Sequence, residues 1–145
     1  QGRRVAAAHA GWRGLVGTDG KGILEASLEP FRPLAPVEYA QGATEIIAWL
    51  GPCIGPEAFE VGDEVRTAFV DVSPEADQCF RPLGQGKWLA DLAGLARQRL
   101  QALGVTGIYG NDSTAAWCTV TNPSRFFSHR RDRVSGRQAA CIWLE

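Results

Sequence analysis

His9 is the first residue in this sequence whose type and setting could do chemistry. It lies within a run of small residues in AAAHAGWRGL, shortly before a glycine, a tryptophan and Arg13. A neutral imidazole can bind a metal ion or act as a general base near physiological pH. A core histidine that bonds to a backbone carbonyl would give the same pattern, so position alone leaves both interpretations of His9 open.

A second segment, FFSHRRDRVSGRQ at residues 126–138, combines His129 with aromatic residues and four arginines, of which Arg130 is the first. A guanidinium group can hold an oxyanion such as phosphate through two parallel hydrogen bonds, and the nearby aromatic rings could stack on a base. The alternative, which the segment taken alone favours, is a solvated basic turn between two strands.

A third candidate is Cys53, which lies between Gly51 and Gly55 in GPCIGP. If His9 lay beside it, the imidazole could lower the pKa of the thiol and generate a thiolate nucleophile. The simpler interpretation, which we favour, is a small apolar thiol that fills the turn after a strand. The two glycines would also let backbone amides approach a ligand closely, although no phosphate-loop lysine accompanies them.

The elements that must position these residues alternate between strands and helices. Apolar runs that stop at glycine or proline predict strands, and apolar residues at helical spacing predict helices. Prolines at 30, 33 and 36 predict an irregular connection, and residues 80–88 a glycine- and proline-rich loop. The expected strands are 3–9, 45–51, 105–110 and 137–145, and the expected helices follow Gly11, begin near residue 22, and span 56–72 and 89–104.

This alternation predicts a mixed α/β layered fold in a single domain that covers residues 1–145. Ligands of α/β sheets usually bind at the carboxyl ends of the strands. His9, Cys53 and the pair Asn111-Asp112 each follow a predicted strand. We therefore expect these three places to converge on one side of the sheet.

Composition narrows the classes of partner. The chain has 145 residues, 45% of them hydrophobic and 21% charged, and a net charge of -1, which gives no positive footprint for nucleic acid or an anionic membrane. No apolar run reaches the roughly 18 residues that span a bilayer, and the first residues are too polar for a signal peptide. We expect a cytoplasmic protein with a small substrate.

The cysteines and the lack of methionine also bear on the cofactors and on whether the sequence is a whole protein. The four cysteines lie far apart with no CxxC pair, so neither a zinc knuckle nor a disulfide framework is indicated. We expect buried or half-buried thiols. The sequence has no methionine and begins QGRRV, which predicts that an upstream segment is missing.

Four stretches, VAAAHAGWRGL, AWLGPCIGPEAFEVGDEVR, ADLAGLARQRL and FFSHRRDRVSGRQAACIWL, together resemble the YfiH family, the laccase-domain proteins once called multicopper polyphenol oxidases. The resemblance covers essentially the whole chain. It implies a mixed α/β layered fold and a zinc-dependent purine nucleoside phosphorylase that acts on adenosine, inosine, guanosine and methylthioadenosine, with some adenosine deamination. Some bacterial members also resemble peptidoglycan editing factors.

The resemblance implies that His9 is one of three zinc ligands, and that Arg13, His129 and Arg130 contact the nucleoside or phosphate. The family's other two ligands lie in Val-His-Gly and Ala-Asp-Cys motifs upstream, and neither motif occurs in this sequence. We therefore expect the C-terminal portion of a YfiH-type domain, which alone binds no zinc, is inactive, and has the missing N-terminal segment as its partner. His129 stands where relatives usually have tyrosine.

Two other classes of function stay open at this point. A polyphenol oxidase would need copper, which is usually held by several histidines with a cysteine. The two histidines of this chain are 120 residues apart, which argues against that function. The third possibility is a non-enzymatic module that folds and binds a partner or the missing half.

Overall fold

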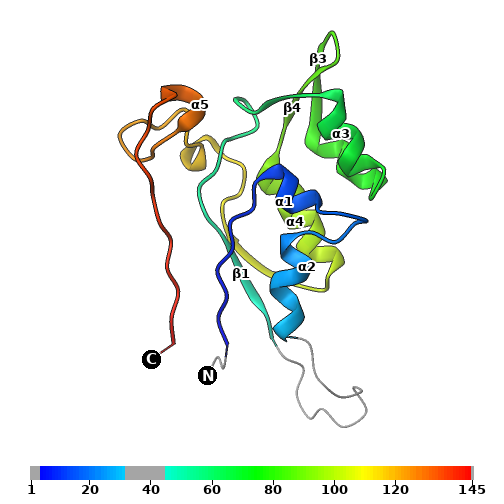
Figure 1. Ribbon diagram of the computed structural model, residues 1–145, viewed down its shortest axis with the longest axis vertical. Coiled ribbons are helices and arrows are strands. Elements are labelled where there is room, and N and C mark those ends of the chain that lie inside the picture. The colour runs from blue at the N-terminus through cyan, green and yellow to red at the C-terminus, as the bar shows by residue number, and fades with distance from the viewer. Residues whose placement is uncertain (1–3, 32–44, 145) are drawn as a thin grey trace.

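The structure, a computed structural model, describes residues 4–31 and 45–144. The outer ends of the two terminal strand predictions lie outside these ranges, as do Pro33 and Pro36 of the predicted irregular connection. Helices pack around two small sheets (Figure 1). No helix in the described ranges is both long enough and apolar enough to cross a membrane.

The described elements follow one another in a mixed α/β order. Three short 3-10 turns accompany them, at Glu29–Phe31, Pro74–Cys79 and Ala115–Trp117. In chain order the helices and strands are α1 (Trp12–Val16), α2 (Ile23–Leu28), β1 (Ile47–Leu50), β2 (Glu60–Gly62), α3 (Asp63–Val70), β3 (Phe80–Gly84), β4 (Lys87–Ala90), α4 (Leu92–Ala102), β5 (Gly107–Gly110) and α5 (His129–Asp132).

The two sheets differ in strand direction. β1 and β5 pair in parallel, with Ile47 opposite Gly107 and Leu50 opposite Gly110. The other sheet is antiparallel with the order β2-β4-β3. Parallel strands need a long crossover connection. The chain between β1 and β5 supplies it, and this crossover contains α3, the whole antiparallel sheet and α4.

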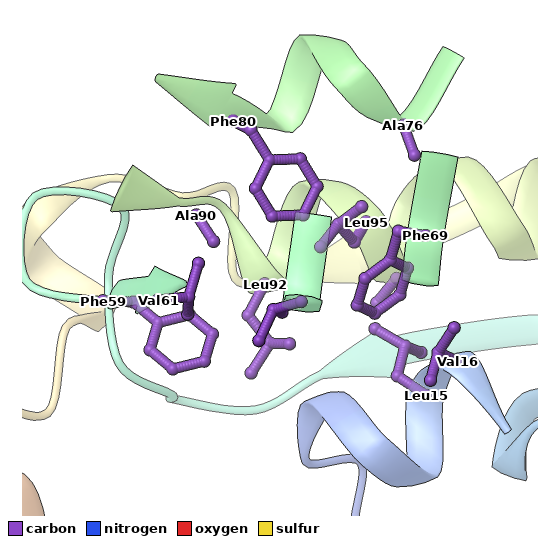
Figure 2. Close-up of a cluster of buried hydrophobic side chains, with 12 residues drawn as sticks. Leu15, Val16, Phe59, Val61, Phe69, Ala76, Phe80, Ala90, Leu92 and Leu95 are labelled. Carbon is purple, nitrogen blue, oxygen red and sulfur yellow. The ribbon is translucent and has the colours of Figure 1, made fainter. Parts of the chain in front are cut away.

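The hydrophobic core lies where α1, α3 and α4 meet the antiparallel sheet. Leu15 of α1, Phe69 of α3 and Leu95 of α4 are almost completely buried, and Figure 2 shows them close to Phe80 of β3. The centroids of the Phe69 and Phe80 rings are 6.1 Å apart, within the range of favourable aromatic pairs. The predicted apolar face of α4 is confirmed by the burial of Leu92, Leu95, Ala96 and Leu100.

Four predicted elements are confirmed and three need correction. The strands expected at 45–51 and 105–110 and the helices expected after Gly11 and near residue 22 are β1, β5, α1 and α2. The helix predicted over 89–104 is α4, which begins only at Leu92 because residues 87–90 form β4. The helix predicted over 56–72 begins only at Asp63, because residues 60–62 pair with β4. The predicted loop at 80–88 is a hairpin, in which Pro82 lies on the edge strand β3, where a missing N–H is tolerated.

The predicted strands at 3–9 and 137–145 are wrong over the part of the chain that the structure describes. Both segments run as extended chain outside any strand (Figure 1). A strand needs a neighbour that pairs with its N–H and C=O groups. Neither segment has such a neighbour within the described ranges, so apolar side chains such as Trp143 stay 71% exposed.

One face of the parallel sheet is apolar and exposed. Ile47 is 62% exposed, and Trp49 and its register partner Tyr109 are each 58% exposed. The Trp49 ring meets the Trp117 ring edge-on, with centroids 5.7 Å apart. Such exposure is unusual, because parallel sheets in folded proteins are normally covered on both faces. We call the surface formed by Ile47, Trp49 and Tyr109 the uncovered face.

Candidate functional site

His9 lies in the extended segment that leads into α1. Its side chain is exposed, and no hydrogen bond or ion pair holds it within the described residues, so the interpretation as a core histidine is wrong. The imidazole folds back over the next turn. Its Nε2 lies 3.3 Å from the position that a Cβ would take at Gly11. In residues 4–31 and 45–144 neither ring nitrogen has a hydrogen-bond partner, and the glycine at position 11 leaves room for the ring.

Arg13 follows in the first turn of α1 and is exposed as well. Its guanidinium carbon lies 4.5 Å from the centre of the Trp12 ring, a cation–π distance. Among the described residues no carboxylate pairs with Arg13. The Trp12 ring thus orients a guanidinium group whose N–H donors remain available to an anion.

The carboxyl ends of β1 and β5 meet, as the sequence predicts. Asn111 is 2% exposed, and its Nδ2 donates to the Gly51 carbonyl at 3.1 Å and to the Cys53 Sγ at 3.3 Å. Its Oδ1 accepts from the N–H of Ser113 at 2.9 Å. Within the described ranges no hydrogen bond or ion pair joins His9 to this cluster, so of the three expected places the structure links Cys53 and Asn111 only.

The environment of Cys53 decides between its two interpretations. Burial raises the pKa of this thiol to about 11, the charges of Asp91 and Cys118 add to the rise, and the hydrogen bond from Asn111 offsets part of it. Cys53 is therefore a protonated thiol near neutral pH. It fills the turn after β1, as the simpler interpretation expects, and it is not an activated nucleophile.

His129 and Arg130 lie in the short helix α5, whose first turn is capped by the Ser128 hydroxyl. Both side chains are exposed. The Arg130 guanidinium carbon lies 5.7 Å from the centre of the Phe59 ring, and its Nη1 donates to the Glu60 carbonyl at 3.3 Å. Arg130 therefore reaches the start of β2 and keeps most of its donors for another partner.

Arg131 has a different role from its neighbour, which the sequence does not reveal. Its Nη1 donates to the carbonyls of Thr119 at 2.8 Å and Val120 at 3.2 Å, and its Nη2 donates to the Phe126 carbonyl at 3.2 Å. Asp132 pairs with the same guanidinium through both of its oxygens, at 2.7 Å each. Arg131 thus fastens the preceding loop to α5.

The donor set available for a metal is small. In residues 4–31 and 45–144 no three side chains of His, Cys, Asp or Glu gather closely enough to hold a metal ion. A catalytic zinc ion normally has three protein ligands and one open position. His9 can supply one of them, so the described residues do not by themselves fit a zinc centre.

Cys118 is a buried thiol with a lowered pKa, which the sequence does not reveal. It is 3% exposed, and burial would raise its pKa, but hydrogen bonds from the Thr121 hydroxyl and from the backbone N–H groups of Thr121, Gly55 and Val120 lower it below the ordinary value for cysteine. Nothing in the residues around it, AWCTVT, signals this cradle of donors.

The whole of residues 1–145 matches the family described as multi-copper polyphenol oxidoreductase laccase. The purine nucleoside phosphorylase YfiH of Escherichia coli is 49% identical over 143 residues, which make up 99% of this chain and 52% of that protein. A purine nucleoside phosphorylase of Pseudomonas aeruginosa is 45% identical over 145 residues, which make up 99% of this chain and 53% of that protein. The chain spans about half the length of these relatives.

Solved structures agree on the fold. A crystal structure of a Neisseria meningitidis protein superposes with a TM-score of 0.68 at 42% identity, covering 86% of this chain and 45% of that one. The Bacillus licheniformis protein YfiH superposes with a TM-score of 0.53 at 31% identity, covering 59% of this chain and 32% of that one. The predicted mixed α/β fold is confirmed, and the chain belongs to the YfiH family of laccase-domain proteins.

Proposed function

We propose that this chain forms part of a zinc-dependent purine nucleoside phosphorylase, in which His9 is one zinc ligand. The observation that carries the proposal is the setting of His9, an exposed imidazole with no hydrogen-bond partner among the described residues, held over Gly11 at the start of α1. Relatives named purine nucleoside phosphorylase match 99% of the chain. The other two ligands would come from polypeptide that corresponds to the unmatched half of these relatives.

The uncovered face supports the need for such a polypeptide. A parallel sheet of two strands with Ile47, Trp49 and Tyr109 exposed on one face leaves a large apolar area in water. Covering this face would stabilise the folded protein by about 25 cal/mol for each Å² of apolar surface removed from water. We propose that the unmatched half of the relatives supplies the apolar elements that cover this face and brings the remaining ligands to His9.

The substrates of the proposed enzyme are a purine nucleoside and phosphate. In phosphorolysis a phosphate oxygen forms a bond to C1′ of the sugar while the bond from C1′ to the base nitrogen breaks, and the products are the free base and a sugar 1-phosphate. Arg13 and Arg130 would hold the phosphate through charge-assisted hydrogen bonds. His129 would line the same site. Adenosine deamination is a second proposed activity.

Polyphenol oxidation is the second candidate, favoured by the family's description. A copper site of this kind needs several histidines, and the two in this chain lie on separate segments, before α1 and in α5. The names of the relatives that match 99% of the chain favour the phosphorylase.

A chimaera tests the proposal. The unmatched part of the E. coli relative is joined to this chain, and phosphate-dependent release of the base from inosine is measured. We expect turnover in the chimaera, its loss in His9→Ala, and no change in Leu83→Ala, because Leu83 is 50% exposed in β3 and belongs to none of the segments with proposed roles. A folded chimaera without turnover, or full turnover in His9→Ala, would contradict the proposal.

A further inference from the structure

The turn GPCIGP and the loop that carries Cys118 meet in an isolated parallel β-bridge. Cys53 and Cys118 are the two bridge partners, and the Thr119 N–H donates to the Cys53 carbonyl at 2.8 Å. Paired backbones lie about 4.8 Å apart, and a disulfide needs Cα atoms about 4.4 to 6.8 Å apart. Side chains of directly paired residues lie on the same face of a ladder. The bridge therefore places the Cα atoms of these two cysteines within the Cα range that a disulfide needs.

Gly55 shapes the turn around the Cys118 sulfur. Its N–H donates to the Cys118 Sγ at 3.2 Å. A Cβ at Gly55 would lie 2.8 Å from the Cys118 Cβ and 3.1 Å from its Sγ, so only glycine allows this approach. The sequence suggests that the Gly55 amide could approach a ligand. In the structure this amide donates instead to the Cys118 thiol.

The two sulfurs are prepared differently. The hydrogen bonds from Gly55 and Thr121 favour the thiolate form of Cys118, whereas burial keeps Cys53 protonated. The Asn111 Nδ2 donates to the Cys53 Sγ at 3.3 Å, which fixes that sulfur in the turn. A cysteine whose thiolate form is favoured, beside a second thiol that stays protonated near neutral pH, is the pairing of an attacked cysteine and a resolving cysteine.

We propose that Cys53 and Cys118 form an oxidisable dithiol whose co-reactant is a hydroperoxide. The Cys118 thiolate attacks the terminal oxygen of the peroxide, a sulfur–oxygen bond forms, the oxygen–oxygen bond breaks, and hydroxide or alkoxide leaves. The Cys53 sulfur then attacks the oxidised Cys118 sulfur. A disulfide forms, the sulfur–oxygen bond breaks, and the departing hydroxide takes the Cys53 proton as water. The two thiols lose two electrons to the peroxide.

The other two cysteines provide matched controls. Cys79 is half-buried beside the start of α4, and burial, followed by the charge of Asp91, raises its pKa to about 11. Cys141 is exposed in the C-terminal extended segment. Neither has a cysteine as its bridge partner in the described residues. A random oxidation would favour the exposed Cys141, whereas the proposed site forms an internal link.

Peptide mapping distinguishes these outcomes. Trypsin does not cut before proline, so it releases Cys53 in residues 22–66 and Cys118 in residues 100–125, each with no second cysteine. The reduced chain is treated with equimolar hydrogen peroxide, its remaining thiols are blocked, and it is digested without reductant. We expect the linked pair 22–66 with 100–125, and we expect Cys79→Ser and Cys141→Ser to give the same linked pair.

Single variants test the order of the two steps. Cys53→Ser leaves Cys118 without its resolving partner, so we expect a sulfenic acid at Cys118 that dimedone traps. Cys118→Ser removes the attacked thiolate, and dimedone labelling at Cys53 should fall at least tenfold below that level. The proposal is overturned if the wild-type chain gives only Cys141 dimers, or if peroxide takes Cys118 to sulfinic acid without any linked peptide.

Discussion

The side-chain amide of Asn111 donates to the Gly51 carbonyl at 3.1 Å and so ties together the carboxyl ends of the two parallel strands. The same amide reaches the Cys53 sulfur, and its oxygen accepts from Ser113, which has a positive φ of 70°. One buried side chain therefore holds the turn after β1 and the turn after β5 in a single arrangement.

Loss of Asn111 should loosen both turns. In Asn111→Ala the half-buried Gly51 carbonyl and Ser113 N–H lose their partner, which costs about 1 kcal/mol in the free energy of unfolding. Asp112→Ala is the control, because Asp112 is exposed and bonds only to Thr114. Urea unfolding monitored by circular dichroism measures both variants. Equal losses in the two variants would contradict this role of Asn111.

The adjacent arginines of α5 should respond differently to lysine. Arg131→Lys loses the planar fork that joins three carbonyls and Asp132, and we expect a larger loss in the free energy of unfolding than Arg130→Lys causes. Arg130→Lys should leave the stability nearly unchanged and raise the KM for phosphate in the chimaera. A stability loss confined to Arg130→Lys would show that the roles are reversed.

The lack of a side chain at Gly11 should allow the His9 imidazole to take its observed position. The φ of Gly11 is -73°, which alanine adopts without strain, but its Cβ would lie 3.3 Å from the His9 Nε2. Gly11→Ala should therefore shift the ring resonances of His9 in the NMR spectrum and weaken zinc binding by the chimaera. At Gly14 a Cβ meets nothing closer than 4.0 Å. Gly14→Ala is the control, and an identical His9 spectrum in Gly11→Ala would refute the steric argument.

Alkaline pH should destabilise the chain through its buried thiols. The folded pKa values of Cys53 and Cys79 are raised from 9.0 to about 11, so above pH 9 the unfolded state has lost protons that the folded state retains. The stabilising contribution is complete below pH 9 and is lost as the pH rises towards about 11. Urea unfolding across this interval should show a smaller decline in Cys53→Ala, and an unchanged decline would contradict the assignment to Cys53.

The parts of the fold that the sequence predicts are those that local patterns determine. The spacing of Leu92, Leu95 and Leu100 alone identifies the buried face of α4, and the apolar run before Gly51 identifies β1. Helical spacing over 56–72 misleads, because pairing of residues 60–62 with β4 outweighs it. Such pairing depends on residues far away in the chain.

In the candidate site, too, the sequence predicts some features and misses others. The meeting of the turns at Cys53 and Asn111 follows from two predicted strands and the rule that the carboxyl ends of parallel strands lie at one edge of a sheet. The difference between Arg130 and Arg131 depends on which guanidinium faces the carbonyls of the preceding loop, and two neighbouring arginines look alike in a sequence. The cradle around Cys118 likewise depends on Gly55, which is 63 residues away.

The zinc content of purified protein tests the central claim most directly. It should be measured by elemental analysis for the isolated chain, for the chimaera with the unmatched part of the E. coli relative, and for that chimaera with His9→Ala. We predict no bound zinc in the isolated chain, one equivalent in the chimaera, and loss of that zinc in His9→Ala. Stoichiometric zinc in the isolated chain, or retained zinc in His9→Ala, would contradict the assignment of His9 as one ligand of a shared zinc site.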